Sequence, residues 1–242
     1  MRPKPKPTPT ESHSSHKKRD GGARDGLGVY IADPAAFPPS RVIYHNTDFV
    51  AVHDLYPKST VHTLLLPRSK AHTLLHPFDA FDDPQFLASV QQETLKLKSL
   101  VAKELQRRYG KHSQSDARRE AVLNGEVELV EGEELPAGRR WEDEVLVGVH
   151  AHPSMNHLHV HVLSRDMFSE RLRHRKHYNS FNTPFLVDVA DFPLAADDAR
   201  RLGKQRYLER DFLCWRCGRN FGNRFKALKE HLADEFEEWK KI

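Results

Sequence analysis

The chain has 242 residues, of which 38% are hydrophobic and 30% are charged, so it can hold one ordinary domain and a small additional module. It contains no run of eighteen apolar residues, which excludes a transmembrane helix, and its N-terminal residues lack the apolar segment of a secretory signal. Only two cysteines are present, Cys214 and Cys217. This count excludes a disulfide scaffold and indicates metal or redox chemistry in a reducing compartment.

The net charge of +4 is distributed unevenly along the chain. Residues 111–143 contain five basic and nine acidic side chains, whereas residues 200–229 contain ten basic and two acidic ones. The basic segment predicts a surface that binds a polyanion such as DNA. A solvated charged face is the alternative, and charge alone does not decide between the two.

The N-terminal residues 1–27 are predicted to be a disordered basic tail. They combine Pro, Ser, Gly and Lys with no aromatic residue, so they cannot bury enough apolar surface to fold. The Lys-Lys-Arg cluster at 17–19 is a weak signal for nuclear import or nucleic-acid binding.

The central region, residues 28–195, is predicted to be one α+β domain with an antiparallel sheet. Short β-rich runs bounded by turn residues predict strands at 42–44, 49–52, 62–66, 145–149 and 157–163. A long amphipathic helix is expected from Pro84, with Asp83 as its N-cap, to Gly110. Residues 111–143 are polar and aperiodic and are expected to form a surface insertion.

The C-terminal residues 196–242 are predicted to be a separate small module that begins with a basic helix over 196–212. The four residues Cys214, Cys217, His231 and Glu235 have approximately the spacing of a zinc finger, with a glutamate where histidine is usual. Asp234 and Glu238 are alternative fourth ligands. A chance Cys-x-x-Cys or a redox pair is also possible, although no βαβ pattern surrounds the cysteines. The module therefore predicts one structural zinc ion.

Three histidines, His157, His159 and His161, alternate with aliphatic residues. On a strand this alternation places the three imidazoles on one face. That face could be an exposed edge or a zinc site, but no nearby carboxylate or cysteine completes a ligand set. The third alternative, which we favour, is nucleophilic catalysis at phosphorus, because neutral imidazole can attack and then leave again.

The segment His157-Leu-His-Val-His-Val-Leu163 resembles the motif of the histidine triad superfamily, and residues 52–68 resemble its second signature block. The chain is still more similar to the aprataxin family, whose members combine this domain with a C-terminal zinc finger and remove AMP from 5′-adenylated DNA. Four features carry this resemblance: Tyr-Pro-Lys at 56–58, His-Ala-His-Pro-Ser-Met at 150–155, Lys-His-Tyr-Asn-Ser-Phe-Asn-Thr-Pro-Phe at 176–185, and the Cys-x-x-Cys pair. The histidine triad fold is therefore expected.

The resemblance also implies residue roles. His159 would be the nucleophile, His161 would bind the phosphate, His157 would orient His159, and His150 would face the leaving DNA phosphate. The remaining active-site roles fall to Ser154 at the phosphate and to Asp54, Leu55, Lys58 and His62 around the nucleotide. DNA contacts are expected from Phe37, Lys176, His177, Tyr178 and Asn179, with Phe37 as the residue that would wedge the DNA end.

These features together predict a hydrolase that acts on adenylated nicked or double-stranded DNA and releases AMP without a catalytic metal. A nuclear, monomeric protein with no membrane partner is expected. The phosphopeptide-binding domain of animal aprataxins is expected to be missing ahead of the core. A general nucleotidyl hydrolase and a non-catalytic zinc-finger DNA-binding protein are the alternatives. The basic segment and the finger argue against the first, and the intact triad argues against the second.

Overall fold

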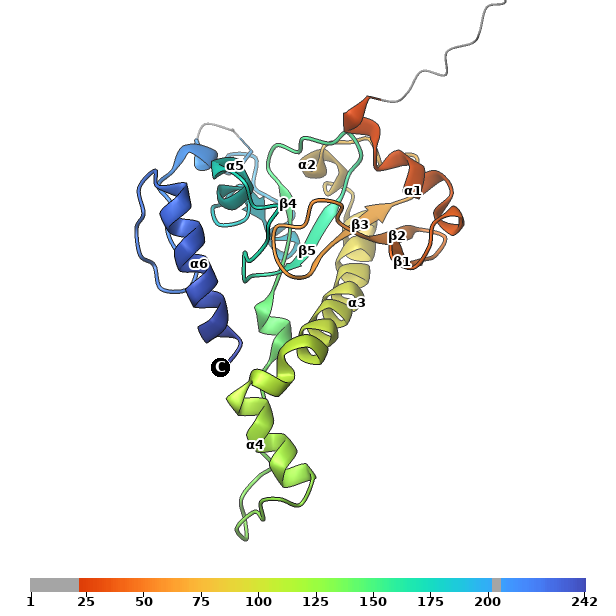
Figure 1. Cartoon of the computed structure of the whole chain (residues 1–242). Coiled ribbons are helices and arrows are strands. Elements are labelled where there is room, and N and C mark those ends of the chain that lie inside the picture. Colours follow the sequence, from red (N-terminus) through yellow and green to blue (C-terminus); the bar gives the residue numbers. More distant parts are fainter. Residues whose placement is uncertain (1–21, 202–205) are drawn as a thin grey trace, which may run out of the picture.

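The computed structural model describes residues 22–201 and 206–242, and its centre is a six-stranded antiparallel sheet (Figure 1). The strands are β1 (Val42–His45), β2 (Phe49–His53), β3 (His62–Pro67), β4 (Val145–His150), β5 (Val160–Ser164) and β6 (Leu186–Val187). Their order across the sheet is β1-β2-β3-β5-β4-β6, so the predicted antiparallel α+β class is confirmed.

The last long strand begins later than predicted. β5 starts at Val160, so His157 and His159 lie in the extended segment before it and only His161 belongs to the strand. Pairing with β3 ends at Val160, and the Leu158 amide instead donates to the carbonyl of Thr73 in a loop. The sequence pattern could not show this change of partner.

The long helix α3 (Pro84–Tyr109) has the predicted start, because the Asp83 carboxylate accepts hydrogen bonds from the amides of Gln85 and Phe86. Its apolar side, including Leu97 and Leu105, is buried in the main core against β5. Each fully buried leucine contributes about 1.5–3 kcal/mol of hydrophobic free energy. The helix therefore anchors the strand on which His161 lies.

The insertion after α3 contains a helix that the sequence interpretation missed. A 3₁₀ turn (Gly110–His112) leads into α4 (Gln114–Leu123), which projects away from the body (Figure 1). Ser113 caps α4 by accepting from the Asp116 amide, and the buried Asp116 carboxylate accepts from the Trp141 indole and the Arg139 amide. The segment projects from the surface, and it contains a helix although its sequence has no apolar periodicity.

The basic helix predicted over 196–212 is absent from the described part of that range, 196–201 and 206–212, which contains only a 3₁₀ turn (Tyr207–Glu209). The Asp198 carboxylate accepts from both the amide and the side chain of Arg200. Such local side-chain bonds compete with helix formation.

The zinc-finger segment packs directly against the catalytic domain. Helix α6 (Phe225–Trp239) places Phe236 and Trp239 in the main core, with ring centroids 5.5 Å and 5.7 Å from that of Tyr109 on α3. The Trp239 indole also donates to Glu144 over 2.7 Å. The last helix of the chain therefore completes the main core and joins the finger closely to the catalytic domain.

Part of the segment predicted to be a disordered tail is folded. Residues 1–21 lie outside the described residues, but 22–27 are folded and include a 3₁₀ turn (Ala23–Asp25) ahead of α1 (Gly28–Ala32). The Arg24 side chain donates to the Ser154 carbonyl, and the Asn156 side chain donates to Asp25. These contacts with a loop distant in sequence order the segment, and the local sequence pattern does not predict them.

Short elements complete the described fold. They are α2 (Pro77–Ala80), α5 (Arg175–Asn179) and 3₁₀ turns at Pro34–Ala36, Trp141–Glu144 and Val189–Asp191. Every helix among the described residues is too short or too polar to cross a lipid bilayer.

Candidate active site and metal centre

A cavity of about 710 Å³ opens beside β3, β4 and β5. It is lined by ten of the residues that the sequence predicted for the site: Asp54, Leu55, Lys58, His62, His150, Ser154, His159, His161, Lys176 and His177. Four others, His157, Phe37, Tyr178 and Asn179, are not part of its lining. The fold thus brings most of the predicted catalytic and nucleotide-binding residues around one space.

The geometry of His159 suits a nucleophile. Its Nδ1 donates to the carbonyl oxygen of His157 over 2.7 Å, which leaves a lone pair on Nε2. The side chain is buried, and burial lowers the pKa of His159 below its usual value. The imidazole is therefore neutral near pH 7, with a fixed tautomer and a free nucleophilic nitrogen.

His157 orients its neighbour through its backbone rather than its ring. Its imidazole lies against the backbone of Gly28, where an added Cβ would come within 2.9 Å of the ring. The absence of a side chain at Gly28 thus permits this close approach of α1. The contact helps to hold the carbonyl that selects the tautomer of His159.

A chain of hydrogen bonds also sets the tautomer of His161. The Lys58 amide donates to Nδ1 of His62 over 3.1 Å, so the neutral His62 ring carries its proton on Nε2. That Nε2 lies 3.0 Å from Nδ1 of His161 and donates to it. His161 must then carry its own proton on Nε2, which is buried and has no hydrogen-bond partner among the described residues. The Nε2–H group of His161 is therefore available to donate a hydrogen bond to a ligand.

His150 also presents a buried ring nitrogen to the cavity. Its ring centroid lies 4.3 Å from that of His161, and its Nε2 is likewise buried without a partner among the described residues. Burial and neighbouring imidazoles hold the pKa values of His150 and His161 well below the usual range. An unsatisfied buried polar group costs about 1–3 kcal/mol. Two such groups lining one cavity indicate a site for a polar ligand.

The nucleotide side of the cavity combines charge with apolar surface. Asp54 accepts a 2.6 Å hydrogen bond from the Tyr56 amide, and its other oxygen lies 3.5 Å from Nε2 of His62. Burial lowers the pKa of Lys58, whose ammonium donates to the Tyr56 carbonyl. The apolar lining comes from Leu27, Tyr30, Val52, Leu55 and Leu64. Such a wall suits a flat nucleobase.

Two of these lining residues, Leu27 and Tyr30, were not expected from the sequence. They belong to the N-terminal segment and α1, which reach the cavity only through tertiary packing. No motif could have indicated them.

The predicted DNA contacts divide into two groups. Lys176 and His177 line the cavity from α5, and burial beside His174 and Lys58 lowers the pKa of His177 to about 4. Tyr178 and Asn179 are buried instead: the Tyr178 hydroxyl donates to the Leu213 carbonyl, and Asn179 donates to the Arg210 carbonyl. Both side chains thus join the domain to the finger, and their role as DNA contacts stays a prediction.

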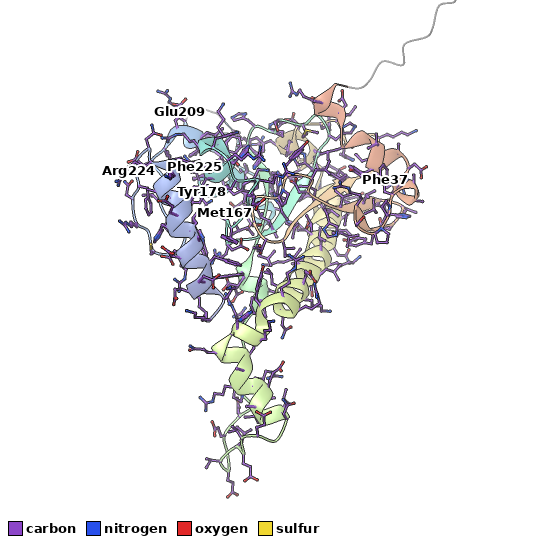
Figure 2. All side chains as sticks on the ribbon, in the orientation of Figure 1. Phe37, Met167, Tyr178, Glu209, Arg224 and Phe225 are labelled. Atoms are coloured by element: carbon purple, nitrogen blue, oxygen red, sulfur yellow. The ribbon has the colours of Figure 1, made fainter. Side chains whose placement is uncertain are left out.

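Phe37, the residue expected to wedge the DNA end, lies beside α1. It follows the 3₁₀ turn 34–36, and its ring packs on Tyr30 with centroids 4.5 Å apart. Figure 2 shows Phe37 and Tyr178 on well-separated parts of the molecule. Phe37 is half-buried against the cluster that contains Leu27 and Tyr30, and its role as the wedge stays a prediction.

The predicted metal ligands do converge. The donor atoms of Cys214, Cys217, His231 and Glu235 all lie within 4.8 Å of one another. Two thiols, an imidazole and a carboxylate are a donor set that zinc accepts in tetrahedral geometry. Asp234 and Glu238 are exposed, and Glu238 pairs with Lys241, so Glu235 is the carboxylate that fits.

The fold and the cavity define the class of protein, a HIT-domain protein with a C-terminal zinc finger. The HIT domain family matches residues 37–168, and the C2HE / C2H2 / C2HC zinc-binding finger family matches residues 182–238.

Comparison with individual proteins narrows this class. The chain is 34% identical over 223 residues to an aprataxin-like protein of Schizosaccharomyces pombe, covering 92% of this chain and 85% of that protein. It is 31% identical over 222 residues to the aprataxin-like protein of Saccharomyces cerevisiae, covering 88% and 95%. A crystal structure of the aprataxin ortholog Hnt3 in complex with DNA superposes with a TM-score of 0.68 at 30% identity, covering 89% of this chain and 96% of that one. The chain therefore belongs to the aprataxin family, and it is a nucleotide- or DNA-directed hydrolase with a zinc finger.

Proposed function

We propose that this protein is a DNA 5′-adenylate hydrolase, which removes AMP from the 5′-adenylated ends that abortive ligation leaves behind. The observation that carries the proposal is the free Nε2 of His159 in a cavity whose other buried imidazoles, His150 and His161, offer unpaired nitrogens. A neutral nucleophile surrounded by hydrogen-bond donors suits displacement at phosphorus, where catalysis depends mainly on positioning and charge stabilisation.

The reaction proceeds in two displacements. Nε2 of His159 attacks the phosphorus of the adenylate, a P–N bond forms, and the P–O bond to the DNA 5′-phosphate breaks. Nε2–H of His161 stabilises the charge that develops on a non-bridging oxygen. The leaving phosphate has a second pKa near 6, so little acid assistance is required from His150. Water then attacks the same phosphorus, the P–N bond breaks, and AMP is released.

We assign the exposed arginines of the basic segment 200–229 to contacts with DNA phosphates. Arg206, Arg210, Arg219 and Arg224 are exposed in the described part of the basic segment. The Arg175 side chain donates to the carbonyls of Glu209 and Arg210, which ties this surface to α5 beside the cavity. Hnt3 has been crystallised with DNA. A free dinucleotide needs no such surface, because it lacks the run of phosphates that arginines neutralise.

The same proposal covers the remaining features. One structural zinc ion is held by the four finger ligands, no catalytic metal is used, and the protein acts as a monomer in the nucleus. Adenylated nicked or double-stranded DNA is the substrate, and AMP and repaired 5′-phosphate ends are the products.

A direct comparison of substrates tests the proposal. The purified protein is incubated with adenylated nicked duplex and with diadenosine polyphosphate at equal concentrations, and AMP release is measured between 50 and 200 mM salt. We expect faster turnover of the duplex, with an advantage that shrinks steeply as salt rises. Faster turnover of the dinucleotide at every salt concentration would indicate a general nucleotidyl hydrolase, and binding of DNA without AMP release would indicate a non-catalytic protein.

A further inference from the structure

The metal centre contains a feature that its four donors do not explain. Arg216, which lies between Trp215 and the second cysteine ligand, directs its guanidinium at Glu235, with Nη1 2.5 Å from Oε2. The other carboxylate oxygen, Oε1, lies 3.1 Å from Nε2 of His231 and thus faces the remaining donors. One oxygen of Glu235 is therefore held by arginine, and the other is left for a metal.

The contact between Arg216 and Glu235 would balance the charge of the metal centre. Metal-bound cysteines are thiolates, so two thiolates and a carboxylate carry three negative charges against the two positive charges of zinc. The centre would have a net charge of −1, which one guanidinium neutralises. A finger with histidine as its fourth ligand is neutral without such a partner, and the matching finger family includes both kinds.

We infer that Arg216 is the positioning residue that allows Glu235 to replace histidine as the fourth ligand of this finger. It fixes the carboxylate with one oxygen toward the other donors and balances the additional negative charge. The Glu235 side chain is only 11% exposed, so solvent screens this pair less than it screens an ordinary surface ion pair. The inference concerns the finger alone and does not depend on the proposed hydrolase activity.

Zinc retention in the full chain tests the inference. We expect Arg216→Ala to weaken zinc affinity about 10–100-fold, the usual effect of removing a group that orients a ligand. Affinity is measured by competition with a chromophoric chelator, and the absorption spectrum of the cobalt-substituted protein reports the geometry of the centre. Arg216→Lys should give an intermediate loss, because lysine restores the charge without the planar fork. The matched control is Arg219→Ala, since Arg219 is an exposed arginine of the same finger that packs over Phe221.

The decisive comparison is made in a Glu235→His background. There Arg216→Ala should change zinc affinity by less than about threefold, because no second carboxylate oxygen remains to be held. If Arg216→Ala does not fold alone but folds and binds zinc together with Glu235→His, the inference is supported. Wild-type retention by Arg216→Ala would overturn it, and so would an equal loss in both backgrounds or failure of the double variant to fold.

Discussion

Replacing Tyr178 with phenylalanine distinguishes a structural role from a DNA contact. The Tyr178 hydroxyl donates to the Leu213 carbonyl over 2.8 Å and accepts from the Trp215 amide over 3.0 Å, on either side of the metal ligand Cys214. Tyr178→Phe keeps the buried ring but removes both bonds. With about 1 kcal/mol for each bond and a further cost for the amide left unpaired, the loss is about 2–3 kcal/mol. For a chain of this length the loss lowers Tm by about 4–12 °C.

Thermal unfolding of the zinc-loaded protein, followed by circular dichroism, measures this shift. Affinity for nicked duplex is measured at 20 °C, far below unfolding, and should remain within about twofold of the wild-type value. Tyr109→Phe is the control, because the Tyr109 hydroxyl makes no hydrogen bond to the described residues while its ring packs on Trp239. A loss of DNA affinity with an unchanged Tm would refute the structural role and restore Tyr178 as a DNA contact.

Three further results are expected. His62→Gln should lower kcat at saturating substrate by about 10–100-fold with little change in KM, because His161 is no longer held as the Nε2–H tautomer that stabilises charge. Nitrogen NMR reports the tautomer of His161, and an unchanged kcat would contradict the role of the hydrogen bond from His62. Burial lowers the pKa of His62 to about 4, so as pH falls from about 6.5 the unfolded chain binds a proton at this histidine before the folded chain does. The free energy of unfolding in urea should therefore be smaller at pH 5 than at pH 7. A larger free energy of unfolding at pH 5 would contradict the burial of a neutral His62. Chelation of zinc should lower Tm in one cooperative transition, because Phe236 and Trp239 join the finger helix to the main core, whereas a finger that melts separately from an intact core would contradict this integration.

The parts of the fold that the sequence predicted are those with strong local signals. The apolar spacing of α3 and its Asp83-Pro84 start are local features, and the structure confirms them. The α4 helix was missed because its Ser113 cap precedes a mostly polar sequence with no clear apolar stripe. The helix predicted over 196–212 rested on composition, and Asp198 forms side-chain bonds to Arg200 there instead. In both places the structure is shaped by local side-chain bonds that hydrophobic periodicity and composition do not register.

The site residues also divide into those that a sequence motif predicts and those that only the tertiary structure reveals. The triad and the finger ligands were predictable because chemistry imposes their spacing; His159 and His161 line the cavity, and the four finger ligands converge. The burial of Tyr178 and Asn179 was not predictable, since a basic and aromatic run looks the same whether it contacts DNA or a neighbouring segment. The contribution of Leu27 and Tyr30 depends on contacts of the turn ahead of α1, and of Gly28 in α1, with a loop more than 100 residues away.

Trapping the covalent intermediate tests the central claim most directly. Rapid quench of the protein with adenylated nicked duplex, followed by mass spectrometry, should locate AMP on His159. His159→Ala should form no adduct and should lose more than about a hundredfold in the rate of AMP release while still binding DNA. The exposed His45 provides a matched control, and His45→Ala should retain both adduct and rate. An AMP adduct on another residue, or His159→Ala turnover within a hundredfold of the wild-type rate, would contradict the account.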